Sequence, residues 1–293
     1  MIKFMKYYWV YFIISALAIA PGAYSLVRWG VNPSIDFTGG TLLEVAVEPN
    51  EQGFNKDKLE ELAKEIGIEV ASVRLSGSNT YLLQASPFDQ ETSTILQQKV
   101  ASVSAQVSEK RFETLGPTLG SEMLRKALVA LGVASATILL FVWKQFSDKK
   151  YGICAILAMF HDTLIVFGGF SLLGHFYNVE VDTLFMTALL TILSFSVHDT
   201  IVVYDRIRES LRSLPKVPYQ AVVNKAINET LGRSVNNSMT IVFMLLALYL
   251  LGGETIRWFV LALLVGTVSG TYSSTFVAAP LLVLWDKWFG KKK

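Results

Sequence analysis

The stretch SFSVHDTIVVYDRIRES, residues 194–210, decides how the rest of the chain is interpreted. It begins inside an apolar run and ends in a dense cluster of charged residues, which is typical of a transmembrane helix leaving the bilayer. Asp199 lies in its apolar part, with His198 before it and Thr200 after it. A carboxylate at that depth costs roughly 2.5–3.5 kcal/mol unless it is paired, protonated or hydrated. The stretch therefore predicts a transmembrane helix that carries a polar functional site.

The composition also indicates a membrane protein. The chain has 293 residues, of which 52% are hydrophobic, and its mean hydropathy is +0.43. Ordinary soluble domains are less apolar, so we expect a lipid bilayer around much of the chain. The formal net charge of +2 gives no basic surface of the kind that nucleic-acid binding needs. The single cysteine, Cys154, excludes an intramolecular disulfide, and no metal-ligand spacing is present.

Six apolar runs are each long enough to cross a hydrocarbon layer of about 30 Å. The first, at about 7–27, contains Ala18-Ile19-Ala20, which imitates a signal-peptidase site. The length of this run, and Pro21 directly after the candidate cleavage point, favour a retained signal-anchor helix over a cleaved signal peptide. The other five runs cover about 127–143, 151–174, 182–204, 236–252 and 257–285.

Residues 29–124 are polar and mixed, and they predict a folded domain between the first two spans. Periodicity and turn signals give the order β-α-β-β-α-β, the split βαβ or ferredoxin-like arrangement, with SGSN at 76–79 as a hairpin turn. We expect a transmembrane helix at 1–28, this domain, and a five-helix bundle at 125–293 with a cytoplasmic loop at about 205–233. The predicted strands are Thr41–Glu48, Glu69–Leu75, Thr80–Ala85 and Gln106–Thr114, and the predicted helices are Asn55–Ile66 and Asp89–Val103.

Lysine and arginine set the predicted orientation. One side of the bundle receives nearly all basic residues of the short loops, and the other side receives only Arg257. Cytoplasmic loops carry such an excess, whereas large domains cross the membrane regardless of their charge. Both termini are therefore predicted to be cytoplasmic and the 29–124 domain to lie outside. The basic residues on the cytoplasmic side are Lys3, Lys6, Lys144, Lys149, Lys150, Arg206, Arg208, Arg212, Lys216, Lys225, Arg233, Lys287, Lys291, Lys292 and Lys293.

A similar motif occurs in two successive spans, HDTLIVF at 161–167 and HDTIVVY at 198–204. His161 and Asp162 should therefore lie at a depth within about a turn of that of His198 and Asp199. Buried carboxylates of this kind serve proton or ion relays, because their charge state depends on burial and on nearby cations. Polar groups in the bilayer also hold helices together by hydrogen bonds. Both interpretations stay open for His161, Asp162 and His198, and the functional one is favoured for Asp199.

The entry to the fifth span, NETLGRSVNNSMT at 228–240, supplies the predicted partner of Asp199. Its polar residues recur at helical spacing and form one face, which has to meet protein or water. Arg233 on this face is the natural counter-ion for Asp199, although it could equally be a flanking residue that snorkels to the interface. The face comprises Arg233, Asn236, Asn237, Thr240 and Met244, and Thr200 of the preceding span adds a further hydroxyl to the predicted site.

The last span carries small residues at intervals of four, namely Gly266, Gly270, Ser274 and Ala278. Such a ladder lets another helix approach closely, either within the chain or in a second subunit. No Gly-rich phosphate loop precedes a Lys-Ser or Lys-Thr pair, so the sequence indicates neither a nucleotide cofactor nor a chemical catalyst. Any energy that the protein uses must then come from elsewhere, and the transmembrane gradient is the obvious source.

Four ordered motifs resemble the SecD/SecF family of the resistance-nodulation-division superfamily. SIDFTGGTLLEV (34–45) resembles the opening of that family's outer domain, and HDTLIVFGGFSLLG (161–174) resembles its third helix. SVHDTIVVYDRIRES (196–210) and NETLGRSVNNSMT resemble its fourth helix and the entry to its fifth. The resemblance covers the whole chain in order. It departs at His198, where the family usually has Asn, and at Asn237, where it more often has Thr.

The resemblance implies a subunit of bacterial protein export in the plasma (inner) membrane. It implies SecD, the SecYEG translocon with its associated subunits and an exported unfolded polypeptide as partners, and a proton or sodium gradient as the energy source. It implies Asp199 and Arg233 as proton-pathway residues, with His198 as a second titratable group. Two other interpretations stay open: a structural assembly subunit, and half of a small-molecule exporter.

Overall fold

A computed structural model describes residues 2–47, 54–75, 79–104, 106–146 and 148–289, without the side chain of Glu254. The chain divides into two compact units. One comprises residues 1–32 and 129–293, and the other comprises residues 33–128. These bounds lie four residues after the expected boundaries at 29 and 125. The two units are described separately below.

The smaller unit is built on a four-stranded antiparallel sheet with the order β2-β3-β1-β4. Two helices each join a pair of strands, so the order along the chain is β-α-β-β-α-β, which confirms the predicted ferredoxin-like fold. The predicted turn at 76–79 lies mostly outside the described residues. The elements are β1 (Gly40–Val47), α3 (Lys56–Glu65), β2 (Val70–Leu75), β3 (Thr80–Ala85), α4 (Gln90–Val103) and β4 (Val107–Leu115).

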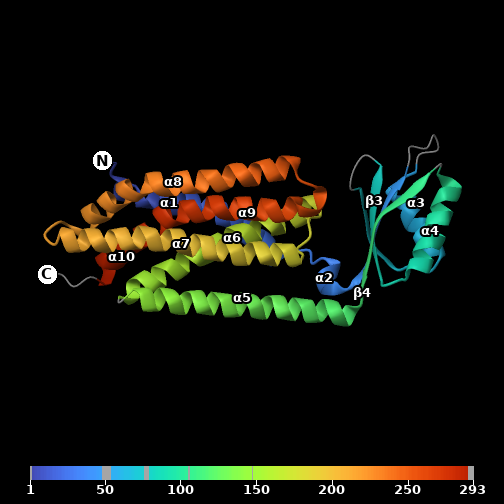
Figure 1. Cartoon of the computed structure of the whole chain (residues 1–293), viewed down its shortest axis with the longest axis horizontal. Helices are drawn as coiled ribbons and strands as arrows, with labels where there is room; N and C mark the ends of the chain where they lie inside the picture. Colours follow the sequence, from blue (N-terminus) through green and yellow to red (C-terminus); the bar gives the residue numbers. More distant parts are fainter. Residues whose placement is uncertain (1, 48–53, 76–78, 105, 147, 290–293) are drawn as a thin grey trace. The chain divides into compact units, whose positions relative to one another are not determined.

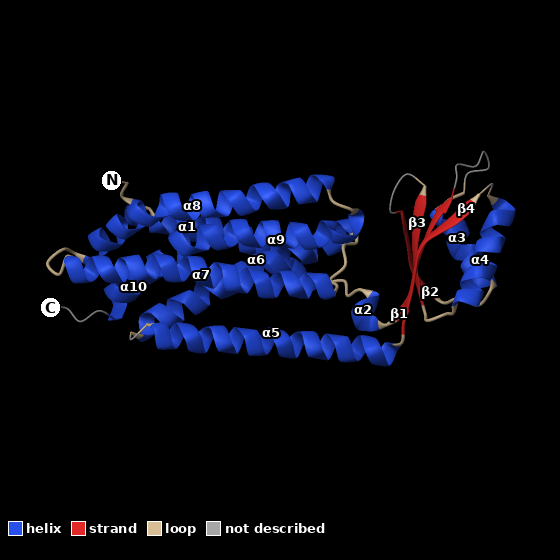
Figure 2. Ribbon diagram, viewed as in Figure 1, coloured by secondary structure: helices blue, strands red, loops and turns tan. Residues whose placement is uncertain are grey.

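Alternation along the strands places the core of this unit between the sheet and its two helices (Figure 2). Leu43 and Leu83 face the helices from the two central strands, and Leu59 and Leu96 reach them from α3 and α4. Each of these side chains is at most 1% exposed. Both helices begin at side-chain caps, because the side chains of Asn55 and Asp89 accept hydrogen bonds from backbone N–H groups of the first turn.

Steric constraints explain why both residues at the end of the SIDFTGG stretch are glycines. A short helix, α2 (Ile35–Thr38), ends at Gly39, which has φ +71°, and Gly40 has φ +127°. A Cβ on Gly39 would lie 2.6 Å from the Cα of Pro117, at the start of α5 (Pro117–Gln145). A larger residue would therefore meet both the left-handed backbone and the start of that helix.

The larger unit consists of helices that lie side by side (Figure 1). Six helices in the described chain are long and apolar enough to cross a membrane, in agreement with the six predicted spans. The last span is interrupted by a single π-helical turn, η2. The elements are the 3₁₀ turn η1 (Phe4–Lys6), α1 (Tyr8–Arg28), α5, α6 (Lys149–Tyr177), α7 (Thr183–Ser213), α8 (Tyr219–Leu251), α9 (Glu254–Ser273), η2 (Ser274–Ala278) and α10 (Ala279–Phe289).

The expected cytoplasmic loop at about 205–233 is instead almost entirely helical. Helix α7 continues to Ser213 and α8 begins at Tyr219, so only residues 214–218 join them. The charged residues that indicated the end of the membrane do not end the helices, and some of them pair on the helix surfaces. Arg206 of α7 contacts Glu209 of the same helix at 2.5 Å and Glu229 of α8 at 2.7 Å.

Helix α7 packs against α6, α8 and α9. More than half of the most apolar segment of α7 is buried inside the chain, whereas only 6% of the most apolar segment of α5 is buried. Helices α1 and α6 approach each other closely at a pair of glycines. A Cβ on Gly22 would lie 2.7 Å from the Cα of Gly168. Backbones that approach so closely leave little room for lipid, and they bring the polar side chains of α1 within reach of α6.

Candidate functional site: two carboxylate pockets in the helical unit

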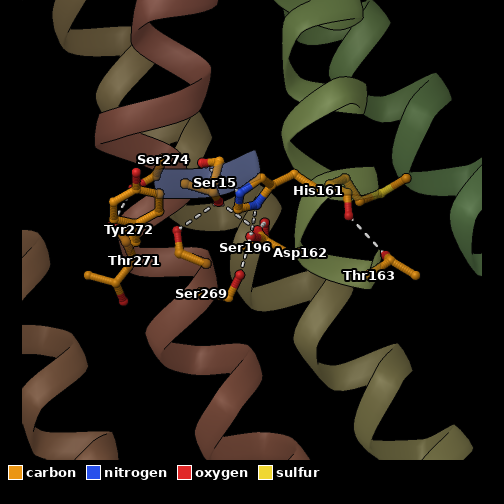
Figure 3. A network of polar contacts seen from close by, with 12 residues as sticks. Ser15, His161, Asp162, Thr163, Ser196, Ser269, Thr271, Tyr272 and Ser274 are labelled. Carbon is orange, nitrogen blue, oxygen red and sulfur yellow. Dashed lines mark hydrogen bonds and ion pairs between the residues drawn. The ribbon is translucent and has the colours of Figure 1, made fainter. Parts of the chain in front are cut away.

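Asp162 of α6 has 0% exposure, the lowest of any charged residue that the structure describes in the helical unit. Three serine hydroxyls donate to its carboxylate (Figure 3). Ser196 of α7 lies 2.5 Å from one carboxylate oxygen, and Ser269 and Ser273 of α9 lie 2.6 Å from their respective oxygens. Three helices therefore meet at one side chain, which we call the Asp162 pocket.

His161 closes the Asp162 pocket on the side of α1. Its Nδ1 lies 3.0 Å from Asp162 Oδ1, and its Nε2 lies 3.0 Å from the hydroxyl of Ser15 (Figure 3). An ionised carboxylate only accepts hydrogen bonds, so beside ionised Asp162 the Nδ1 carries the hydrogen and donates it. The ring also lies flat beside Tyr272 of α9, with centroids 6.2 Å apart. The imidazole therefore links α1 to the buried carboxylate.

Asp199 of α7 occupies a second and simpler pocket. Its side chain is 6% exposed and accepts hydrogen bonds from Ser234 of α8 at 2.8 Å and from Ser274 at 2.5 Å. Ser274 is the first residue of the π-helical turn, and the preceding Ser273 donates to Asp162. Two consecutive serines thus bind two different carboxylates. Ser234 and Ser274 define the Asp199 pocket.

Arg233 does not pair with Asp199 in this structure, contrary to the sequence prediction. Its side chain is exposed, and among the described residues no lysine or arginine nitrogen lies within 4.0 Å of the Asp199 carboxylate. The neighbouring Ser234 takes that place. One step along a helix turns a side chain by about 100°, so a face that points Ser234 at α7 points Arg233 away from it.

His198 is also exposed and lies outside the Asp199 pocket, so the expected second titratable group is not beside the carboxylate. Thr200 is 1% exposed, and its hydroxyl is buried without a hydrogen-bond partner among the described residues. It therefore belongs to the interior of the bundle.

The polar face predicted on the fifth span points away from the rest of the chain. Its members are all exposed, whereas the buried face of α8 carries Thr230, Ser234 and Ser238. The serines and threonines bury more easily because their small hydroxyls bond within the helix, as Ser238 does with the carbonyl of Ser234 at 2.8 Å. The exposed residues are Arg233, Asn236, Asn237, Thr240 and Met244.

The small-residue ladder of the last span lies against α7 of the same chain. A Cβ on Gly266 would lie 2.3 Å from the side chain of Ile192, and one on Gly270 would lie 3.3 Å from Ser196. Ser274 and Ala278 are fully buried. Ser274 has a second contact that its spacing did not indicate, because its hydroxyl binds Asp199.

Sequence reasoning missed the serines that hold both carboxylates. A signal was available in part, since Ser269 and Ser273 are one helical turn apart and flank Gly270 in the last span. Ser15 stood alone among apolar residues, and Ser196 and Ser234 stood beside the more conspicuous polar residues of their stretches, so none of the three gave a signal of its own. Among the described residues, no three His, Cys, Asp or Glu side chains gather in a way that could hold a metal ion.

Six membrane-length helices with carboxylates buried among hydroxyls, together with an α+β unit, define a polytopic membrane protein of the transport class. Comparison with known families is specific. The family model "Protein export membrane protein SecD/SecF, C-terminal" matches residues 95–288, and the "SecD/SecF GG Motif" model matches residues 25–51. The chain belongs to the SecD/SecF family of protein-export membrane proteins.

Individual relatives agree with this assignment. The chain is 40% identical to the protein translocase subunit SecF of Thermobaculum terrenum, over 98% of this chain and 94% of that protein. It is 38% identical to SecF of Anaerolinea thermophila, over 95% and 92%. The crystal structure of SecDF from Thermus thermophilus superimposes with a TM-score of 0.86 at 37% identity. That match covers 98% of this chain but only 39% of the SecDF chain.

Proposed function

We propose that this chain is a SecF-type subunit that works with SecD and uses the proton or sodium motive force to drive late steps of polypeptide export. The observation that carries the proposal is the Asp199 carboxylate. It lies within the helical unit at 6% exposure, and two hydroxyls bind it. A carboxylate in such a place changes its hydrogen bonds whenever it gains or loses a proton.

Protonation of Asp199 would change how three helices hold together. The ionised carboxylate accepts from Ser234 and from Ser274 at once. The protonated acid carries a hydrogen on one oxygen, which becomes a donor and a weaker acceptor, so the hydrogen bond to one of the two serines weakens or reverses its direction. A gradient supplies about 2.3 kcal/mol per charge per 100 mV, which exceeds the net worth of about 1 kcal/mol of a typical hydrogen bond. The gradient is therefore large enough to loosen α8 or the π-helical turn from α7.

The segment that leads into the outer unit is bonded to the helical unit, which supports transmission between them. The side chain of Asn32 donates to the carbonyl of Gly174 at 2.9 Å, and Ser171 donates to the carbonyl of Gly30. The backbone N–H of Val181 donates to the carbonyl of Asn32 at 2.7 Å. A shift of α6 would therefore pull on this segment. We propose that the outer unit then holds an emerging polypeptide against backsliding.

The exposed polar face of α8 supports a partner within the membrane. Asn236 and Asn237 lie where the apolar part of α8 begins, and polar side chains at the start of a span face protein or water rather than lipid. We propose that SecD covers this face, including Arg233, and that the SecYEG translocon and the unfolded polypeptide are further partners. The proposed location is the bacterial inner membrane, with both termini cytoplasmic and the sheet-containing unit outside.

The substitution Asp199→Asn tests the proposal. Membrane vesicles that contain the variant with its partners should lose gradient-dependent export, while the variant still inserts and co-purifies with SecD. His198→Asn is the matched control, because the neighbouring side chain lies outside the pocket, and it should export normally. Normal export by Asp199→Asn would refute the proposal. Loss of SecD binding together with export would favour the structural assembly subunit instead.

A further inference from the structure

A groove opens between the last turns of α5 and the first turns of α6. The two helices converge where the chain passes from one to the other, and they diverge from there (Figure 1). At the point of convergence the ring of Phe146 stacks on the ring of Tyr151, with centroids 5.2 Å apart. The space between the helices has a volume of about 240 Å³. We call it the α5–α6 groove, and its apolar walls are formed by Leu139, Leu140, Trp143, Gly152, Ile153 and Ile156.

The absence of a side chain at Gly152 makes the groove deep. The position is buried, yet a Cβ added there would meet no atom within 4 Å. The glycine therefore leaves a slot between the helices instead of bringing two backbones together, as Gly22 and Gly168 do. A dry apolar cavity of about 150 Å³ holds a benzene molecule. The α5–α6 groove is larger and has room for a section of a hydrocarbon chain.

The mouth of the α5–α6 groove is positively charged. Lys149 lines it, with its Nζ 5.9 Å from the centre of the Trp143 ring, and Lys144 lies in the last turn of α5. Among the described residues, neither lysine has a carboxylate oxygen within 4.0 Å. Asp148, the acid that lines the groove, is instead paired with Lys150 at 3.2 Å. Two cations without an acidic partner therefore lie beside an apolar slot.

We propose that the α5–α6 groove binds an anionic phospholipid. One acyl chain lies along the apolar walls, and Lys149 and Lys144 hold the phosphate of the headgroup. A single lipid molecule supplies both the hydrocarbon and the anion that the groove lacks. Lysines beside a membrane attract anionic lipids, and tryptophan favours the depth of the headgroups. This lysine-rich end of the helical unit is also the one that we propose to face the cytoplasm, where the leaflet is rich in anionic lipids.

A bound lipid joins α5 to the rest of the helical unit. Only 6% of the most apolar segment of α5 is buried, so contacts within the chain do little to hold that helix in place. A lipid in the groove touches α5 and α6 at once and fills the space between them. The inference does not depend on the function proposed for Asp199.

The test is the thermal stability of the purified full chain in dodecyl maltoside micelles that contain added lipid. A ligand that binds only the folded state raises the unfolding midpoint in a concentration-dependent way. Dioleoyl phosphatidylglycerol should raise the midpoint in a saturable manner, and at a lower mole fraction than dioleoyl phosphatidylcholine, which has the same chains but no net charge. Salt should weaken this preference, because it screens the lysines. Glycerol phosphate, an anion without acyl chains, should not replace the lipid.

Charge removal at the mouth has a matched control. Lys149→Gln should raise the half-saturating mole fraction of phosphatidylglycerol by about fivefold, as expected for one lysine near an anionic surface. Lys216→Gln makes the same change at an exposed lysine that does not line the groove, and it should keep the wild-type value. The proposal is overturned if both lipids give the same midpoints, or if the two lysine variants respond alike.

Gly152→Leu removes the slot itself. Leucine favours a helix more than glycine does, and the added Cβ meets no neighbour, so this variant should fold. Its midpoint should no longer distinguish the two lipids, and mass spectrometry of the intact protein should show fewer retained phosphatidylglycerol molecules. Gly232→Leu, the matched change at an exposed position of α8, should behave as the wild type does.

Two further results decide against the proposal. One is a Gly152→Leu variant that keeps the wild-type preference for phosphatidylglycerol. The other is a wild-type chain that dimerises in detergent while Gly152→Leu stays monomeric, because a second copy of the chain would then occupy the groove. If Gly152→Leu does not fold, the two lysine variants carry the test. None of these results affects the export test of Asp199→Asn.

Discussion

The sequence His-Asp-Thr occurs at 161–163 and at 198–200, and the two copies face the protein interior differently. In α6 the histidine and the aspartate are buried, and the hydroxyl of Thr163 donates to its own helix at the carbonyl of Met159. In α7 the aspartate and the threonine are buried and the histidine is exposed. The same three letters therefore present different chemistry to the bundle.

The difference corresponds to a rotation of the motif by about one residue, or 100°, about the helix axis. The neighbours of each helix decide that rotation. Helix α6 packs against α1, α7 and α9, and its histidine reaches Ser15 of α1. Helix α7 packs against α8 and α9, and Asp199 binds Ser234 of α8 and Ser274 of the π-helical turn after α9. A motif in a membrane helix thus predicts polar groups but not which of them meet.

The largest expected effect concerns the aspartates themselves. Asp162→Ala leaves three hydroxyls and an imidazole without their shared acceptor, so it should lower the free energy of unfolding by about 3–5 kcal/mol. Asp199→Ala frees only two hydroxyls and should cost about 1–3 kcal/mol. Unfolding of the purified chain in detergent, at one fixed cation composition, measures both. Equal losses would show that the two pockets do not differ as described.

The two histidines should differ next. His161→Ala removes the hydrogen bonds to the Asp162 carboxylate and to Ser15, and we expect a loss of about 1–3 kcal/mol. His198→Ala removes an exposed side chain and should change stability by no more than about 0.5 kcal/mol. The same unfolding measurement applies. A larger effect at His198 would mean that the rotation of the motif in α7 is wrong.

The two threonines of the motif should respond differently to loss of the hydroxyl, because only Thr163 has a hydrogen-bond partner among the described residues. Thr200→Val replaces a buried hydroxyl that has no partner among the described residues with a methyl of similar shape, so it should stabilise the chain by about 1 kcal/mol. Thr163→Val removes a hydroxyl that donates at 2.9 Å and should be neutral or slightly destabilising. Thermal midpoints of the two variants, compared in parallel, decide the point. Destabilisation by Thr200→Val would indicate a partner for that hydroxyl.

The smallest effect lies outside the helical unit and depends on pH. Hydrogen bonds from the backbone N–H and the hydroxyl of Thr92 lower the pKa of Asp89, which caps α4. A lowered pKa means that this contribution to stability is complete above the unfolded-state pKa of about 3.9 and is lost as the pH falls below it. The protection of the α4 amides, measured as their exchange rate relative to the intrinsic rate at each pH, should therefore fall in acid. Asp89→Asn keeps a cap without a titrating group and should remove that pH dependence. If the pH dependence of exchange in α4 is the same in this variant, the Asp89 cap is not its cause.

Much of the fold could be predicted because it depends on patterns with a period. The apolar runs gave six spans, and strand alternation with helical periodicity gave the β-α-β-β-α-β order and bounds mostly within one residue of those observed. The Asp199 stretch was recognisable because a carboxylate in an apolar run is expensive wherever the helix faces. The charged segment after it predicts a loop but is helical, because charge marks where the membrane ends rather than where a helix ends.

The sequence by itself determined how many helices cross the membrane, the fold of the sheet-containing unit and which acids lie deep among apolar residues. These follow from the cost of exposing apolar surface or of burying charge, which each segment carries with it. Only the tertiary structure decided that Ser234 rather than Arg233 meets Asp199, and that Ser196, Ser269 and Ser273 converge on Asp162. The rotation of each helix sets those contacts, and it results from the packing of all its neighbours at once.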